Sequence, residues 1–309
     1  MSTQRANNRL AFPDSIELGV GNWAWGDKLF WGHRRRYTDA DAQAAFEASL
    51  AAGVNFFDTA EFYGLGRAER LLGRFMRASG QPVMVATKFM PYPWRLWRGS
   101  LLRALRGSLH RLGMAQVDMM RQQPKSLPFS GWRWMDALAD AVEAGLTRMV
   151  GVSNYSLAQM RRAHVALAQR GIALASNQVE YSLLHRDPER SGLLDACREL
   201  GVTLIAYSPL AKGLLTGKYT PENPPPAARH RLLGSQLARA QPLVGLMREI
   251  GQARGGKTPA QVALNWAICK GAVPIPGARN AGQAAQNAGA IGWRLTDDEI
   301  AALDAASED

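Results

Sequence analysis

The sequence predicts a single α/β domain of the (β/α)8 TIM-barrel class. Eight short apolar segments recur along the 309 residues, and each is followed by a segment with the periodicity of a helix. Most of these apolar segments lack polar–apolar alternation, so both faces of each strand should be covered, as in a parallel sheet. Strict repetition of strand and helix implies right-handed crossovers, and eight repeats favour closure into a barrel. An open, doubly wound parallel sheet is the alternative.

Four strand–helix pairs are expected in the first half of the chain. The first strand, over residues 16–21, leads into a loop rich in tryptophan. The segment 38–52 should be a helix, because Thr38 can cap its N-terminus and Gly53 can end it. Apolar runs predict strands at 55–58, 83–88 and 117–121. Amphipathic segments that stop at or near a glycine predict helices at 68–78, 99–112 and 132–144.

The second half continues the alternation and then adds extra helices. Apolar runs predict strands at 148–153, 175–180, 203–208 and 272–276. Helices are expected at 157–170, 192–200, 235–252, 259–270 and 281–288, with a last one after Thr296. Glycines again mark helix ends, as Gly171 and Gly201 do. The barrel should therefore span residues 16–309, with residues 1–15 as a flexible leader.

Composition is that expected of a globular, cytoplasmic protein. Apolar residues make up 47% of the chain and charged residues 20%. The sequence has no run of about 18 apolar residues that would predict a transmembrane helix, and its N-terminus lacks the apolar core of a secretory signal. Cys197 and Cys269 fall in helical segments and are expected to be free thiols. The histidines show no ligand-like spacing, so no metal site is expected.

The formal net charge of +11 raises the question of a nucleic-acid partner. Basic residues cluster at 33–36, 95–111, 161–162 and 229–231. No zinc-finger spacing, RNP-like motif or basic helix-turn-helix pattern accompanies these clusters. A basic surface, with some arginines serving an anionic cofactor or substrate, is the favoured interpretation, so neither a nucleic-acid nor a membrane partner is expected. The sequence carries no indication of the oligomeric state.

Two glycine motifs match nucleotide-binding signatures without their structural context. Residues 19–24 fit G-x-G-x-x-A, but an aromatic loop follows where the dinucleotide fingerprint needs a helix. Residues 251–258 fit the P-loop pattern, but they follow a predicted helix instead of a strand. Thr258 and Pro259 have the form of an N-cap and a first helical residue, which predicts a turn between two helices.

Polar side chains lie where the predicted strands end. Asp58 ends one strand, Tyr63 follows it in the next loop, and Lys88 ends the following strand. In a barrel, the loops after the strands carry the active site. If the strands are adjacent, Asp58 can hold Lys88 charged, and the ammonium can lower the pKa of the Tyr63 hydroxyl. A phenol tuned in this way donates or accepts a proton in carbonyl and alcohol chemistry.

Several motifs resemble those of the aldo-keto reductases, and the last part is most similar to the branch with plant plastid and bacterial members. They are F-F-D-T-A-E-F-Y-G at 56–64, A-T-K at 86–88, V-G-V-S-N-Y at 150–155, S-N-Q-V-E-Y-S-L at 176–183 and P-I-P-G-A-R-N at 274–280. The likeness extends from Leu18 to Leu303. It implies NADP(H)-dependent reduction of an aldehyde or ketone by a tetrad of Asp, Tyr, Lys and His. Asp58, Tyr63 and Lys88 match the first three members.

The same resemblance implies a set of cofactor-binding residues in the loops that follow the strands. The set is Gly21, Trp23, Ser153, Asn154, Gln178, Tyr207, Ser208, Leu210, Gly213, Gly277, Arg279, Gln283 and Asn287. Ser153 and Asn154, joined by Gln178, match the residues that bind the nicotinamide carboxamide, and Tyr207 matches the ring that stacks on the nicotinamide. Arg279 would meet the 2′-phosphate, because a guanidinium suits a phosphate dianion.

The fourth position of the tetrad departs from the family. The family reads V-D-L-Y-Q-L-H-x-P at the fourth strand, whereas residues 117–124 read V-D-M-M-R-Q-Q-P and place Gln123 at the histidine position. A glutamine amide can orient a carbonyl oxygen but cannot exchange a proton near neutral pH. The favoured hypothesis is carbonyl reduction with Tyr63 as proton donor and Gln123 as an orienting group. The alternatives are reduction of an activated C=C or an imine, or a non-catalytic NADPH-binding regulatory subunit.

The loops after the strands also bear on the substrate. Tryptophans are frequent in the loops after strands one, three and four, and half of them are expected to line an apolar or aromatic cleft. Arg95 and Arg98 follow Lys88 closely and could meet an anionic substrate. Aromatic and anionic small-molecule carbonyls both remain open from the sequence.

Overall fold

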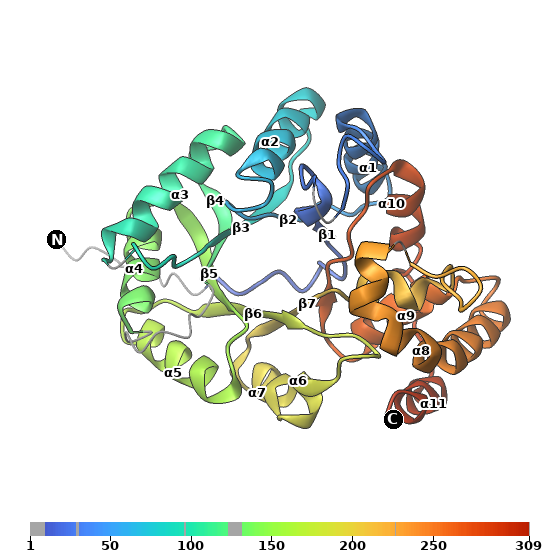
Figure 1. Ribbon diagram of the computed structural model, residues 1–309. Coiled ribbons are helices and arrows are strands. Elements are labelled where there is room, and N and C mark those ends of the chain that lie inside the picture. Colours follow the sequence, from blue (N-terminus) through green and yellow to red (C-terminus); the bar gives the residue numbers. More distant parts are fainter. Residues whose placement is uncertain (1–9, 29–30, 96, 123–131, 226, 309) are drawn as a thin grey trace.

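The computed structural model describes residues 10–28, 31–95, 97–122, 132–225 and 227–308. Within these residues, eight parallel strands form one sheet in the order β1 to β8. Figure 1 shows the strands at the centre of the molecule and the helices around them. The predicted single-domain (β/α)8 TIM barrel is confirmed.

The strands pair in sequence order and close on themselves. Their bounds are β1 Val20–Gly21, β2 Phe56–Asp58, β3 Met84–Phe89, β4 Val117–Gln122, β5 Thr147–Ser153, β6 Leu174–Glu180, β7 Thr203–Tyr207 and β8 Val273–Pro274. Between the first and last strands, the Gly19 amide donates to the Pro274 carbonyl at 3.0 Å and the Gly21 amide donates to the Pro276 carbonyl at 3.0 Å. This closure excludes the open, doubly wound sheet. β1 and β8 are shorter than the sequence predicted.

The helices follow the predicted order with two differences. Their bounds are α1 Asp39–Ala51, α2 Arg67–Ser79, α3 Gly99–Leu112, α4 Trp132–Glu143, α5 Leu157–Ala168, α6 Asp187–Arg190, α7 Leu193–Leu200, α8 Ala227–Ala253, α9 Pro259–Cys269, α10 Ala281–Ala288 and α11 Asp297–Ala306. α6 was missed because four residues are too short to show a period. α8 begins at Ala227 instead of residue 235, because alanine, arginine and leucine there favour a helix.

The apolar core has two parts. One part fills the barrel interior and includes Phe56, Met119 and Ile205, and the larger part lies between the strands and the helices. Phe12 packs on Phe56 with ring centroids 5.2 Å apart. Residues 1–9 of the expected leader lie outside the described residues, but Phe12 shows that the packed chain extends upstream of residue 16. Across the described ranges, no helix is long and apolar enough to cross a bilayer.

The two nucleotide-like glycine motifs form other structures. The segment after β1 is a short 3-10 helix, Asn22–Ala24, which offers no extended helix N-terminus of the dinucleotide-binding kind. The P-loop-like segment is a turn between α8 and α9, in which the Lys257 amide donates to the Gly251 carbonyl at 2.8 Å. Thr258 caps α9 by accepting from the Gln261 amide at 3.3 Å. The predicted helix-to-helix turn is confirmed.

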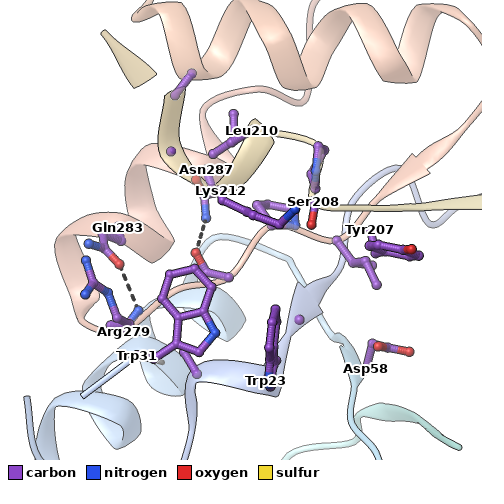
Figure 2. A pocket seen from close by; sticks show the side chains of 18 of the residues that line it. Trp23, Trp31, Asp58, Tyr207, Ser208, Leu210, Lys212, Arg279, Gln283 and Asn287 are labelled. Atoms are coloured by element: carbon purple, nitrogen blue, oxygen red, sulfur yellow. Dashed lines mark hydrogen bonds between the residues drawn. The ribbon is translucent and has the colours of Figure 1, made fainter. Parts of the chain in front are cut away.

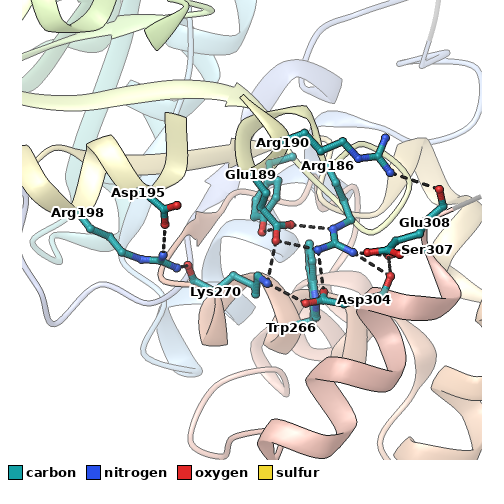
Figure 3. A network of polar contacts seen from close by, with 11 residues as sticks. Arg186, Glu189, Arg190, Asp195, Arg198, Trp266, Lys270, Asp304, Ser307 and Glu308 are labelled. Atoms are coloured by element: carbon teal, nitrogen blue, oxygen red, sulfur yellow. Dashed lines mark hydrogen bonds and ion pairs between the residues drawn. The ribbon is translucent and has the colours of Figure 1, made fainter. Parts of the chain in front are cut away.

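A polar network fastens the C-terminal helix to the barrel (Figure 3). Arg186 donates to both oxygens of Glu189 at 2.8 Å and lies 3.3 Å from the Asp304 carboxylate on α11. Lys270 pairs with Glu189 at 2.8 Å and with Asp304 at 2.9 Å. Tyr181 also donates to Glu189, at 2.9 Å. Burial alone would raise the pKa of Glu189, but these hydrogen bonds lower it to about 2.

Replacing Glu189 by glutamine is expected to lower the free energy of unfolding at pH 7 by about 1–3 kcal/mol, because charge-assisted hydrogen bonds are lost. The folded pKa of Glu189 lies below its ordinary value of 4.5, so the stability it contributes is present above pH 4.5 and is lost as pH falls toward 2. Urea unfolding of both proteins at several pH values measures this. A stability difference that stays constant between pH 5 and about 2 would contradict the assignment.

Candidate active site

Asp58, Tyr63 and Lys88 meet at the C-terminal end of the barrel. Asp58 ends β2, and Lys88 lies on the adjacent strand β3. The Lys88 ammonium pairs with the Asp58 carboxylate and donates to the Thr59 carbonyl at 2.9 Å. It also lies 3.3 Å from the Tyr63 hydroxyl, to which it donates. The structure therefore brings together the three side chains that the sequence predicted to act together.

The Asp58 carboxylate is buried and has more partners than the sequence suggested. Besides Lys88, Arg121 on β4 donates from Nη1 to Asp58 Oδ2 at 2.6 Å. Gln178 on β6 donates to the same oxygen at 3.1 Å. Asp58 and Lys88 are each 1% exposed, and Arg121 is fully buried. One carboxylate thus faces two cations in the barrel interior.

Burial dominates the protonation behaviour of this cluster. Burial lowers the pKa of Lys88 to about 8, with Asp58 opposing the shift and Arg121 adding to it. Burial also raises the pKa of Tyr63, Asp58 raises it further, and Arg121 opposes both. For Asp58, the two cations outweigh burial and the pKa is lowered. The expectation that the pKa of Tyr63 is lowered is therefore wrong in net sign, because burial outweighs the neighbouring positive charge.

A cavity of about 460 Å³ opens above these residues. Every residue that the sequence assigned to the cofactor lines this cavity, together with Asp58 and Tyr63. Figure 2 shows Asp58 and Tyr207 at one side of the pocket and Arg279 with Gln283 at the other. Residues from loops that are far apart in the chain therefore line the same cavity.

Unusual backbone conformations shape the wall after β5 and β7. Asn154 has φ 58°, a left-handed conformation that asparagine tolerates better than most residues, and its amide donates to the Gln178 carbonyl at 2.8 Å. After β7, Ser208 has φ 52° and Lys212 has φ 55°. Gly213 follows with φ 104°, which a side chain would strain. These turns place backbone groups of the loop along the cavity wall.

The Arg279 side of the cavity suits an anionic ligand. Arg279 and Lys212 line it, and Lys212 pairs with Glu180 at 3.3 Å. Helix α10 begins here, with Asn280 accepting from the Gln283 amide at 3.0 Å, and a helix N-terminus favours negative charge. The Arg279 amide donates to Gln283 Oε1 at 2.9 Å. These donors fit the phosphates of NADP(H), the cofactor that the sequence implies.

Aromatic side chains line the part of the cavity near Tyr63. The Trp23 ring stacks on the Tyr63 ring with centroids 6.4 Å apart, and Trp31 packs edge-on against Trp23 at 5.6 Å. Phe62 also lines the pocket and contacts Tyr63. By contrast, Arg95 is paired with Glu61. The described surroundings of Tyr63 therefore favour an aromatic ligand over one held by Arg95.

Some site residues were not identified from the sequence. Gln123, predicted at the histidine position, lies outside the described residues, so its orienting role stays a prediction. Arg121 was missed as a partner of Asp58, because the sequence did not show which way its side chain points. Lys212 lines the cavity but was not assigned to it, whereas Trp31, which also lines it, is one of the loop tryptophans of which half were expected to line a cleft. Lys212 could have been found, since it lies between Leu210 and Gly213, which were both assigned to the cofactor.

Comparison with known proteins gives the family. A model of the "Aldo/keto reductase family" matches residues 17–308. "Pyridoxal reductase, chloroplastic" of Arabidopsis thaliana is 42% identical over 305 residues, covering 94% of this chain and 83% of the relative. An uncharacterized oxidoreductase of Mycobacterium tuberculosis is 38% identical over 287 residues, covering 90% of this chain and 85% of the relative.

Solved structures agree with the sequence relatives. The aldo/keto reductase of Klebsiella pneumoniae, crystallised with NADP and acetate, is 28% identical and has a TM-score of 0.73. The match covers 94% of this chain and 90% of the Klebsiella chain. The barrel, the matched residues and these relatives lead to one conclusion. This chain belongs to the aldo/keto reductase family.

Proposed function

We propose that this protein is an NADPH-dependent reductase of aldehydes, with Tyr63 as the proton donor. The observation that carries the proposal is the placement of the Tyr63 hydroxyl, 3.3 Å from the Lys88 ammonium, in the wall of the large cavity. Membership of the family supports NADP-dependent oxidoreductase activity. The complex of the Klebsiella relative with NADP supports the choice of cofactor.

The roles of the residues follow from their protonation states. NADPH, when bound, supplies the hydride for the carbonyl carbon. Tyr63 keeps its proton across the neutral range, because burial raises its pKa, and donates it to the carbonyl oxygen as negative charge develops there. Lys88, charged below about pH 8, stabilises the phenolate that remains. Asp58 fixes the ammonium in place through their buried ion pair.

We also propose aromatic aldehydes as the substrate class. Trp23 and Phe62 contact the Tyr63 ring, Trp31 packs on Trp23, and all of these rings line the cavity, where they suit a flat apolar substrate. The name of the Arabidopsis relative, a pyridoxal reductase, supports a heteroaromatic aldehyde of that kind. Gln123 is proposed to orient the carbonyl oxygen as a neutral hydrogen-bond donor.

A stopped-flow assay of NADPH oxidation tests both proposals. The panel holds pyridoxal, other aromatic aldehydes, aliphatic aldehydes of similar size, an imine and an enone. We expect the aromatic aldehydes to have the highest kcat/KM in the panel and to yield an alcohol as product. Product analysis that finds reduction only of the C=C or C=N bond would replace the proposal. Tight NADPH binding without turnover of any compound would make the protein a binding subunit.

Replacing Arg279 by methionine is expected to raise the Kd for NADPH by roughly 10- to 100-fold, since a charge-assisted contact to the 2′-phosphate is lost. The Kd for NADH should stay the same, because NADH has no 2′-phosphate. Quenching of the intrinsic tryptophan fluorescence measures both constants, and NADH serves as the internal control. Equal weakening of both cofactors would show that Arg279 shapes the pocket instead of reading the phosphate.

A further inference from the structure

Arg121 is a buried cation that the family motif does not contain. The motif has glutamine at this position of the fourth strand, whereas this chain has arginine. Arg121 pairs in register with Lys88 on β3, so both side chains enter the barrel interior at the same level. Its side chain is fully buried, and Nη1 lies 2.6 Å from Asp58 Oδ2.

The barrel is built to hold this side chain. The residue paired with Arg121 on β5 is Gly151. A Cβ atom at Gly151 would lie 3.0 Å from Arg121 Cγ and 2.4 Å from Ser176 Oγ, so only glycine leaves room. Arg121 Nε donates to the Met119 sulfur at 3.4 Å. Asp58 on β2, Met119 on β4 and the space left at Gly151 on β5 thus fix the direction of the Arg121 side chain.

Stability alone explains this arrangement poorly. Asp58 already has Lys88 and Gln178 as partners, and Arg121 adds a second cation to one carboxylate. The Arg121 Nη2 group has no hydrogen-bond partner among the described residues, although it is buried. A buried cation in excess, with an unsatisfied donor, disfavours the folded state. Such costs are typical of functional sites.

We propose that Arg121 is a positioning residue of the active site: it shares Asp58 with Lys88 and thereby keeps an excess positive charge beneath Tyr63. This inference rests on the proposed function. Arg121 does not line the cavity among the described residues, so its charge acts on Lys88 and Tyr63 from beneath them and not by contact with a substrate. The Arg121 guanidinium supplies a positive charge to the site, which the neutral side chain of Gln123 cannot supply. When Tyr63 gives up its proton, that charge stabilises the phenolate.

The effects of Arg121 on the pKa values of Lys88 and Tyr63 agree with this geometry. Arg121 lowers the pKa of Lys88 and opposes the rise in the pKa of Tyr63. The titratable and charged groups that shift the pKa values of Lys88 and Tyr63 are Asp58, Glu69, Arg121 and Tyr207. Glu69 is itself paired with Arg111 at 2.6 Å, which balances its charge. If Arg121 is removed, Lys88 and Gln178 are the described side chains that still bind the Asp58 carboxylate.

Arg121→Gln, which restores the family residue, tests the inference. Wild-type kcat/KM should decrease above about pH 8, where Lys88 loses its proton. In Arg121→Gln this descending limb should move up by about one pH unit, and kcat at pH 7 should fall by roughly tenfold. KM and the Kd for NADPH should not change. Arg121→Lys should keep the wild-type limb, because it retains the charge.

Two controls distinguish a positioning role of Arg121 from a general effect of losing an arginine and from a wrong choice of substrate. Arg148→Gln makes the same change on the neighbouring strand β5, where the side chain is 62% exposed, and should leave the pH profile unchanged. The 13Cε resonance of Lys88, assigned with Lys88→Met, reports the lysine titration without any turnover. Its midpoint should be higher in Arg121→Gln than in wild type. A limb and a midpoint that both remain near pH 8 would overturn the inference. Absence of aldehyde turnover in wild type would overturn only the proposed function.

Discussion

Replacing Tyr63 by phenylalanine is expected to lower kcat for aldehyde reduction by roughly 10²- to 10⁴-fold, the range typical for loss of a general acid. Phenylalanine keeps the ring that stacks on Trp23 at 6.4 Å and removes only the hydroxyl. Lys88 retains Asp58 and the Thr59 carbonyl as partners, so the ion pair beneath the pocket is preserved. The loss should therefore fall on the chemical step.

Single-turnover stopped flow measures that step directly, and cofactor titration shows whether NADPH binding is intact. Tyr92→Phe is a matched control, because Tyr92 stacks on Trp94 in the loop after β3 and does not line the cavity. The control should keep wild-type kcat. A Tyr63→Phe variant that retains more than about a tenth of wild-type kcat would assign the proton to another donor.

The sequence predicted the parts of the site that follow from chain order. Asp58 ends β2 and Lys88 is the last residue but one of β3, and consecutive strands in a (β/α)8 barrel are neighbours. Their proximity therefore needed no side-chain detail. The family motifs then placed residues such as Asn154 and Arg279, which the structure brings to one cavity. Polar residues at strand ends are informative because packing alone does not require them there.

The sequence could not predict what depends on side-chain direction and burial. Arg121 stands in an apolar strand, and a charged residue there is ordinarily expected to face solvent. Only the register with Lys88 and the space left at Gly151 explain its inward direction. The predicted direction of the Tyr63 pKa shift was wrong for the same reason. Burial raises this pKa, and the spacing of residues in the sequence does not show how deeply a side chain is buried.

The largest expected effect on stability is that of Asp58→Asn. This change keeps the shape of the side chain but leaves Lys88 and Arg121 buried without a carboxylate. Removing one partner from a buried ion pair costs about 3–5 kcal/mol of folding free energy, and here two cations lose the same partner. Urea unfolding at pH 7 measures the loss. Activity should fall too, since Lys88 without Asp58 gives up its proton at lower pH.

The pH dependence of that loss distinguishes unbalanced charge from a packing defect. The folded pKa of Lys88, about 8, lies below its ordinary value of 10.5, so protonated Lys88 opposes folding and stability rises as pH increases from 8 toward 10.5. Without Asp58 the folded pKa drops further, and the deficit of Asp58→Asn should be larger at pH 7 than at pH 9. Asp140→Asn is the matched control, because Asp140 pairs with Arg98 and Arg170 on the surface. Its cost should stay within about 1 kcal/mol and independent of pH in this range. A deficit of Asp58→Asn that is equally large at both pH values would mean that lost packing, and not two unbalanced cations, destabilises the variant.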